Sequence, residues 1–224
     1  MIEATAKRRE RRSAPTETGR RWQEVVDTAA QVFYRDGYES ASVNDLAAAL
    51  GITKGSLYHY VQNKEDLLYA IIREMHILNR ENLRRAIESE GPPLTRLRAY
   101  FVGHVRTNID HLEKSSLIYR DLRHLSTRRR REIVRLRDDV EQFVREALST
   151  AIAEGEACPE LDPNLASIEM FSTANAIYQW YQPAGERSAA EVAGSVADFV
   201  LAAVACRRGA GGDSCFRHTL TEPQ

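Results

Sequence analysis

A short segment near residue 55 gathers groups that can donate hydrogen bonds to nucleic acid. On a helical wheel of about 100° per residue, Gly55 and His59 point directly away from the apolar Leu57. Ser56 and Tyr58 flank them, so the outer face carries two hydroxyls, an imidazole and bare backbone. Such groups donate to phosphate oxygens and to base edges, and a helix start that lacks a side chain can approach DNA closely. The face is therefore a candidate for contact with DNA.

Two short helices are needed to present this face, and the sequence predicts both. Ser42 can cap a helix that ends at Gly51, and Thr53 can cap a second helix that continues to about Val61. Two helices that flank a glycine-containing turn form a helix-turn-helix. From spacing alone, an ordinary helical hairpin with a polar outer face remains an alternative, because short helix pairs are common.

A second group of reactive side chains, Asp121, His124 and Ser126, lies within one short stretch. Their offsets of 3 and 5 residues give no catalytic-triad geometry by themselves. The sequence contains no nucleophile-elbow, zinc-protease, phosphate-loop or dinucleotide-binding motif. An enzyme built on a helical bundle is therefore a remote alternative, and we expect no catalytic residue, metal or cofactor.

The composition limits the class of protein. The formal net charge is -1, so a nucleic-acid partner must be bound by a local basic patch. The chain has no run of about 18 apolar residues and no apolar signal-peptide core, which predicts a cytoplasmic protein without a membrane partner. The cysteines at 158, 206 and 215 are too few and too far apart to indicate a disulfide framework.

Apolar spacing is helical throughout and predicts an all-α protein of about nine helices. We expect a disordered basic arm at residues 1–19, for which DNA contact and a merely solubilising role are alternatives, and a flexible tail at 207–224. Between them we expect a helix-turn-helix domain over 20–70 and a ligand-binding and dimerisation domain over 71–206. Asn63 is expected to cap a helix to about Glu88, and body helices are expected near 94–110, 115–126, 127–155, 163–182 and 188–206.

The stretch from Val26 to Leu68 resembles the DNA-binding head of the tetracycline-repressor (TetR) family. The resemblance extends over about 40 residues. The matching positions are Ala29-Ala30, Phe33, Gly37-Tyr38, Ser42-Val43, Leu46-Ala47, Leu50-Gly51-Ile52, Lys54 to Val61 and Asn63 to Leu68. It implies a dimeric transcription regulator with a recognition helix in the DNA major groove.

The same resemblance implies roles for individual residues. Lys54, Gly55, Ser56 and His59 would approach bases, and Tyr58 would bind a phosphate through its hydroxyl. Lys64 would bind a backbone phosphate, and Ser42 and Thr53 would place hydroxyls and helix-start amides on phosphates. Asn44 occupies a position that sometimes reads a base.

In this family the last two long helices of each subunit form the dimer interface, and the sequence is compatible with that. Apolar stripes with helical spacing include Ile168, Phe171, Val192, Val196, Phe199, Val200 and Val204. The alternative is that these stripes only close the core of the monomer. Two heads in one dimer predict a near-palindromic operator with half-sites one helical turn or more apart.

The body also contains aromatic and polar residues suited to a small-molecule cavity or, equally, to a helical core. They are Tyr100, Phe101, His104, Asn108, Tyr119, Arg120, Tyr178, Trp180 and Tyr181. Segments at 117–121, 128–131, 153–155 and 177–183 are similar to repressors of lipid and sterol degradation that respond to acyl-coenzyme A. This resemblance implies an acyl-CoA effector whose phosphates meet Arg120, Arg123 or the Arg128–Arg131 run, although a solvated helix start also explains that run. We expect a repressor that a small-molecule ligand releases from its operator, and the alternative is an activator or a regulator that acts without a ligand.

Overall fold

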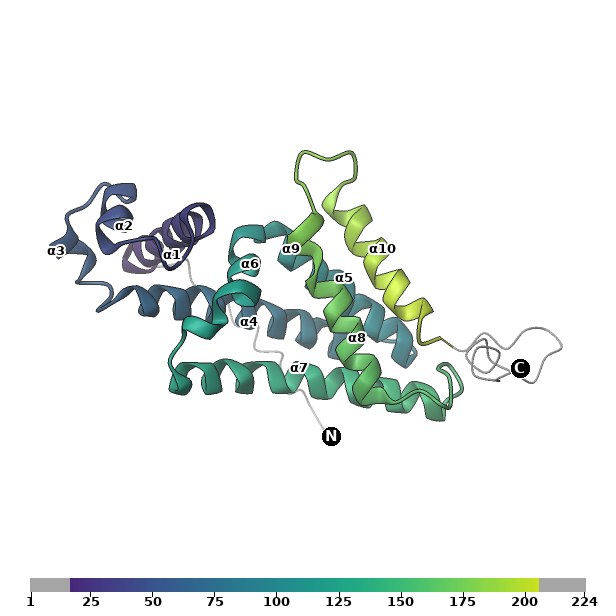
Figure 1. Cartoon of the computed structure of the whole chain (residues 1–224). Coiled ribbons are helices and arrows are strands. Elements are labelled where there is room, and N and C mark those ends of the chain that lie inside the picture. Colours follow the sequence, from purple (N-terminus) through teal and green to yellow (C-terminus); the bar gives the residue numbers. More distant parts are fainter. Residues whose placement is uncertain (1–16, 206–224) are drawn as a thin grey trace, which may run out of the picture.

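The computed structural model describes residues 17–205, which are helical throughout apart from short connections (Figure 1). The helices are α1 (Glu17–Asp36), α2 (Val43–Ala49), α3 (Lys54–Leu57), α4 (Lys64–Glu88), α5 (Pro93–Asp110), α6 (Leu112–Asp121), η1 (Leu122–His124), α7 (Thr127–Ala153), α8 (Pro163–Asn175), α9 (Ile177–Trp180) and α10 (Ala189–Ala202). The prediction of an all-α protein with about nine helices is confirmed, since α9 is a single turn that follows α8 after one residue. The expected arm and tail lie outside the described residues, except that positions 17–19 already belong to α1.

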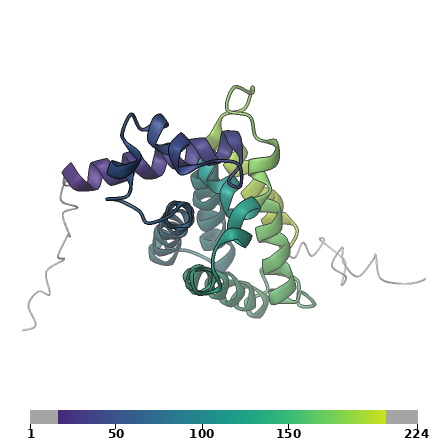
Figure 2. The ribbon, with the colours of Figure 1, turned by 60° about the vertical axis from the view of Figure 1, so that its left-hand side comes forward.

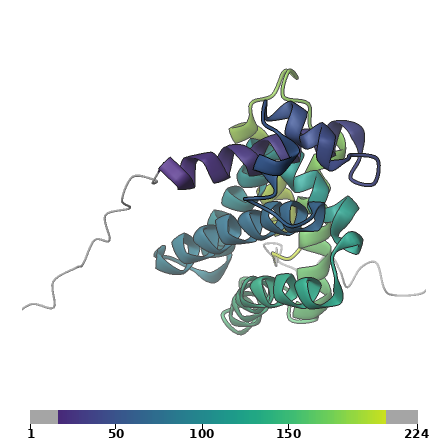
Figure 3. The same ribbon diagram turned by 90° about the vertical axis from the view of Figure 1, so that its left-hand side faces the viewer.

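The molecule has a head of α1 to α3 at one end and a body of α5 to α10 at the other, with α4 joining them (Figure 1). Figure 2 looks along α4 and α7, which pack side by side, and Figure 3 shows α1 lying above α4 where the head faces the viewer. Apolar side chains form two clusters, one that joins the head to residues of α6 and α7 and another within the body. Helix α4 contributes Leu67 to Met75 to the first cluster and Leu83 and Ala86 to the second, so a single rigid element is anchored in both cores.

Helix starts in the head are fixed by the caps that the sequence predicts. The side-chain oxygens of Ser42, Thr53 and Asn63 accept from the backbone amide three residues later, at 3.2, 3.1 and 3.1 Å. These bonds satisfy amides that have no partner within the helix. The first helix ends at Gly37, whose φ of 83° is a left-handed conformation that glycine adopts readily.

The recognition helix is shorter than predicted. Instead of continuing to Val61, α3 ends at Leu57, and the chain turns tightly so that the Tyr60 amide donates to the Leu57 carbonyl at 2.9 Å. This contact spans three residues rather than four, as in a 3-10 turn. The turn still buries Leu57 and Val61, so the apolar pattern is satisfied without a longer helix.

Candidate DNA-binding face and ligand cavity

The outer face of the helix-turn-helix carries the polar groups that the helical wheel placed there. Gly55 and His59 are exposed, as is Tyr58 with 47% of its surface accessible, whereas Leu57 is fully buried. Lys54 and Asn44 are exposed on the same unit. The arrangement leaves an amine, a phenol and an imidazole free to meet a duplex while Leu57 holds the helix to the head.

The hydroxyls at the two helix starts are engaged within the protein. Ser42 Oγ donates to the Asp45 carboxylate at 2.7 Å, and Thr53 Oγ1 and Ser56 Oγ share a hydrogen bond of 2.9 Å. The reason is the cap geometry, which turns each hydroxyl back onto its own helix. Contact between these positions and DNA would therefore involve rearranged hydroxyls or the backbone.

The Lys64 ammonium, which was expected to bind a phosphate, is engaged within the protein. Its ammonium donates to the backbone carbonyls of Tyr38, Glu39 and Ala41 at 2.7, 2.9 and 3.1 Å. All three N–H donors of the lysine are thus used to hold the loop between α1 and α2. This arrangement follows from the loop conformation, which points three carbonyls at one spot and could not be read from the sequence.

We predict that Lys64→Met destabilises the head without altering phosphate binding. Hydrogen bonds from a charged donor stabilise by about 1.5–3 kcal/mol, so urea unfolding should show a loss of about 2 kcal/mol. The salt dependence of operator affinity should keep its slope, because that slope counts neutralised phosphates. Unchanged stability together with a shallower slope would restore Lys64 to the phosphate contacts.

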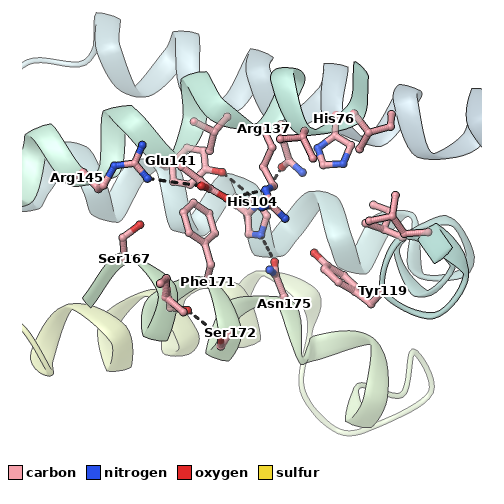
Figure 4. Close-up of a pocket in the computed structure, with 18 of the residues that line it drawn as sticks. His76, His104, Tyr119, Arg137, Glu141, Arg145, Ser167, Phe171, Ser172 and Asn175 are labelled. Atoms are coloured by element: carbon pink, nitrogen blue, oxygen red, sulfur yellow. Dashed lines mark hydrogen bonds and ion pairs between the residues drawn. The ribbon is translucent and has the colours of Figure 1, made fainter. Parts of the chain in front are cut away.

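A cavity of about 530 Å³ opens in the body between α4, α5, α6, α7 and α8. Figure 4 shows Glu141 and Arg145 on one wall, with Ser167, Phe171 and Ser172 on the opposite wall. Apolar side chains of Ile118, Leu122, Ile133, Val134 and Val140 also line the cavity. Apolar surface that alternates with polar groups in one cavity is a feature of small-molecule sites.

Three of the residues predicted for a ligand line this cavity, namely Tyr100, His104 and Tyr119. Three more lie one layer behind them: Phe101 packs on Tyr100, Asn108 on His104, and Tyr178 stacks on Tyr119 with ring centroids 5.1 Å apart. The remaining three lie away from the lining, since Arg120 and Trp180 are exposed and Tyr181 packs against the body core. Aromatic character alone therefore does not distinguish the residues that line the cavity from the residues that pack behind them.

Other lining residues escaped the sequence analysis, and one set of them carried a readable signal. Arg137, Glu141 and Arg145 recur every four residues and therefore share one face of α7. Arg137 Nε lies 2.6 Å from Glu141 Oε1, and Arg145 Nη1 lies 3.5 Å from Glu141 Oε2. Two cations and one anion leave the charged strip with a net positive charge, which favours an anionic ligand group.

His76 and Asn79 on α4 and Asn175 on α8 also line the cavity and were not anticipated. His104 Nδ1 lies 2.9 Å from Asn79 Oδ1, and its Nε2 lies 2.8 Å from Asn175 Oδ1. Burial lowers the pKa of His104 and of His76 to about 4, so both imidazoles are neutral near pH 7. These histidines and asparagines thus form an uncharged polar part of the wall, whereas the strip on α7 is charged.

The predicted dimer residues divide into two groups. Val192, Val200 and Val204 are buried within the subunit, and Phe171 packs against Tyr100 in the cavity, so none of these four is available to a partner. Ile168 and Phe199 are instead 63% and 68% exposed, and Val196 is partly exposed. Leu165 and Trp180 are exposed as well. One side of the α8 and α10 stripes thus closes the core of the subunit, and the other side is exposed and available for a dimer interface.

Within residues 17–205, none of the helices combines the length and apolar character needed to cross a bilayer.

Comparison with known proteins shows which family has this sequence and architecture. Residues 25–71 match the sequence family described as bacterial regulatory proteins of the tetR family, and residues 90–204 match the tetracyclin repressor-like C-terminal domain. The chain belongs to the TetR family. It is therefore a DNA-binding transcription regulator, and the region around α2 and α3 is the helix-turn-helix of a TetR protein.

Individual TetR proteins resemble the chain over most of its length. The transcriptional repressor KstR2 of Mycolicibacterium smegmatis is 26% identical over 197 residues, which cover 87% of this chain and 96% of KstR2. The crystal structure of PfmR from Thermus thermophilus has a TM-score of 0.73 and 31% identity, covering 80% of this chain and 97% of PfmR. A structure of AibR in complex with isovaleryl coenzyme A and operator DNA has a TM-score of 0.69 and 29% identity, with 80% and 97% covered.

Proposed function

We propose that this TetR protein is a homodimeric repressor that leaves its operator when an acyl-coenzyme A thioester enters the body cavity. The observation that carries the proposal is that α3 exposes a face of hydrogen-bond donors while its Leu57 is fully buried in the head. The proposed DNA contacts are Ser42, Asn44, Thr53, Lys54, Gly55, Ser56, Tyr58 and His59. Two such faces related by a two-fold axis fit a near-palindromic operator.

The exposed apolar side chains of α8 and α10 support the dimer. Phe199 and Ile168 are among the most exposed large apolar residues in the described part of the chain, and Leu165 lies one helical turn from Ile168. Burying such side chains against a second copy gains about 25 cal/mol for each Å² of apolar surface removed from water. This face is therefore the proposed subunit interface.

The cavity and the relatives support the effector class. Apolar walls suit an acyl chain, and the net positive strip of Arg137, Glu141 and Arg145 suits phosphate or carboxylate oxygens. AibR, a relative of known structure, was captured with isovaleryl coenzyme A and operator DNA. The exposed arginines near the start of α7 can meet further phosphates of the same ligand.

Ligand and head are connected through α6 and η1. Tyr119 and Leu122 line the cavity, and two residues later the His124 ring packs on Tyr38 of the head with centroids 5.1 Å apart. A ligand that displaces this segment would alter how the head sits on the body. Release then requires that the liganded state disfavour the head spacing that fits the operator.

The test of the effector is an operator-release titration. Purified protein bound to a fluorescent operator should be released by medium-chain or long-chain acyl-CoA, and the corresponding free coenzyme A should have no effect. Fluorescence anisotropy measures the fraction bound. If no member of an acyl-CoA panel both binds the protein and releases DNA, the thioester proposal fails.

We predict that Tyr58→Phe weakens operator binding by about 1 kcal/mol, or about fivefold, because one hydrogen bond to phosphate is lost. The phenol is half exposed, so the variant should fold with wild-type stability. A gel-shift titration measures the affinity. Wild-type affinity in this variant would remove Tyr58 from the phosphate contacts.

A further inference from the structure

Four uncharged polar side chains on α4, α5 and α8 line the cavity, and we call them the histidine cluster: His76, Asn79, His104 and Asn175. His104 contacts both asparagines and also lies 3.3 Å from the Tyr100 hydroxyl through Nδ1. Figure 4 shows His76 and His104 near Arg137, with Asn175 below His104. Helices α4, α5 and α8 thus place uncharged hydrogen-bonding groups along the cavity.

His76 is the unsatisfied member of this cluster. Its Nε2 atom is buried and has no hydrogen-bond partner among the described residues, although the side chain lines the cavity. Most buried polar atoms in proteins are hydrogen-bonded, and leaving one unpaired destabilises the folded state. A ligand that supplies the missing partner would be favoured over one that does not.

The charge state of the cluster limits what that partner can be. Burial lowers the pKa of both histidines to about 4, so near pH 7 neither is a cation for a carboxylate or phosphate. A neutral imidazole offers one N–H, which can donate to a carbonyl or hydroxyl oxygen, and one lone pair, which can accept from a hydroxyl. The anionic part of a ligand is served instead by Arg137 and Arg145 on α7.

We propose that the histidine cluster recognises an uncharged oxygen on the apolar part of the effector, through His76 Nε2. The effector is then an amphiphile with an anionic or phosphate-bearing group and, in addition, a carbonyl or hydroxyl group on its ring or chain. A simple saturated acyl chain would leave His76 unsatisfied and would bind less tightly. This inference rests on the proposed function only in taking the cavity as the effector site.

The test uses the full-length protein without DNA and two probes that differ by one carbonyl. The probes are 4-cyclohexylbutanoic acid and 4-(4-oxocyclohexyl)butanoic acid, titrated at pH 7 in a calorimeter. One neutral hydrogen bond predicts that the ketone binds about fivefold more tightly. The preference should vanish in His76→Phe and persist in His76→Gln, which keeps a polar group near the same place. His111→Phe, which changes a histidine outside the lining, should behave as the wild type.

A second measurement keeps the test independent of whether His76→Phe folds. In wild-type protein with ¹⁵N-labelled histidine, the His76 imidazole resonance should move on addition of the ketone and remain in place with the cyclohexyl acid. Equal affinities for the two probes, or an unmoved His76 resonance when the ketone is added to its solubility limit, would overturn the inference. Operator release does not enter these measurements, so a failure of the proposed repression and a failure of this site give different results.

Discussion

Replacing Phe199 with aspartate is expected to separate the dimer and to abolish tight operator binding. Phe199 is 68% exposed on α10, and the exposed Ile168 lies on the neighbouring α8. In the proposed dimer these side chains are buried, and an unpaired carboxylate among them is strongly unfavourable. Loss of the second head removes the bivalent contribution, so affinity should fall roughly 100-fold or more.

Sedimentation velocity and fluorescence anisotropy on the same sample measure both effects. The Phe199→Asp subunit should keep its helical content in circular dichroism, because the side chain is 68% exposed in the single subunit, although loss of the partner lowers the apparent thermal stability. Ile87→Asp is the matched control, since Ile87 is 52% exposed but lies on α4, outside the α8 and α10 face. A dimeric Phe199→Asp variant with wild-type affinity would exclude this face as the interface.

Lys114→Met is expected to loosen the attachment of the head to the body. Lys114 is only 8% exposed on α6, and its ammonium lies 2.5 Å from Asp27 of α1 and 2.9 Å from Glu74 of α4. Removing one partner of a buried ion pair leaves the other charges uncompensated, which costs about 3–5 kcal/mol when burial is complete. Asp27 and Glu74 retain some solvent contact, so we expect a loss of about 2 kcal/mol in chemical unfolding.

The pH dependence of folding stability provides a second test of the Lys114 interaction. Burial lowers the pKa of Lys114, whereas its hydrogen bonds to Asp27 and Glu74 and the charges of these residues raise it. The raising effects outweigh the effect of burial, so the pKa lies above its ordinary value. A raised lysine pKa stabilises the fold fully below the unfolded value near 10.4, and this stabilisation is lost as the pH rises through the folded value. The wild type should therefore lose more stability than Lys114→Met in strongly alkaline buffer.

The surface pair of Arg106 and Asp110 provides a control for that prediction. It is also an ion pair, with a separation of 2.8 Å, but both side chains are about half exposed. Arg106→Met should change stability by less than about 0.5 kcal/mol. Equal effects of Arg106→Met and Lys114→Met would mean that Lys114 is an ordinary surface charge rather than a link between head and body.

Local signals in the head predicted its structure well. Ser42, Thr53 and Asn63 cap helices because short polar side chains satisfy nearby amides, and Gly37 ends α1 because a left-handed residue is needed there. These rules depend only on neighbours in the chain. The length of α3 did not follow, because tight turning after Leu57 satisfies the same apolar pattern as a longer helix.

The cavity was harder to predict because it is built from residues distant in sequence. His104 on α5 meets Asn79 of α4 and Asn175 of α8, and no periodicity within one helix reveals such a meeting. The four-residue spacing of Arg137, Glu141 and Arg145 was visible, but whether that face of α7 meets solvent or a cavity depends on packing. Likewise, Val200 and Phe199 are adjacent in sequence, yet one is buried in the subunit and the other faces outward.

The central claim is that the α3 face, presented twice by a symmetric dimer, reads a specific operator. Selection of bound fragments from genomic DNA by the purified protein at physiological salt, followed by footprinting, tests it most directly. We predict a small set of enriched fragments that share a near-palindromic element, protected in two half-sites one helical turn or more apart. The enrichment should disappear with the paired substitutions Tyr58→Ala and His59→Ala. A wild-type protein that enriches no fragment over random duplex would contradict the account.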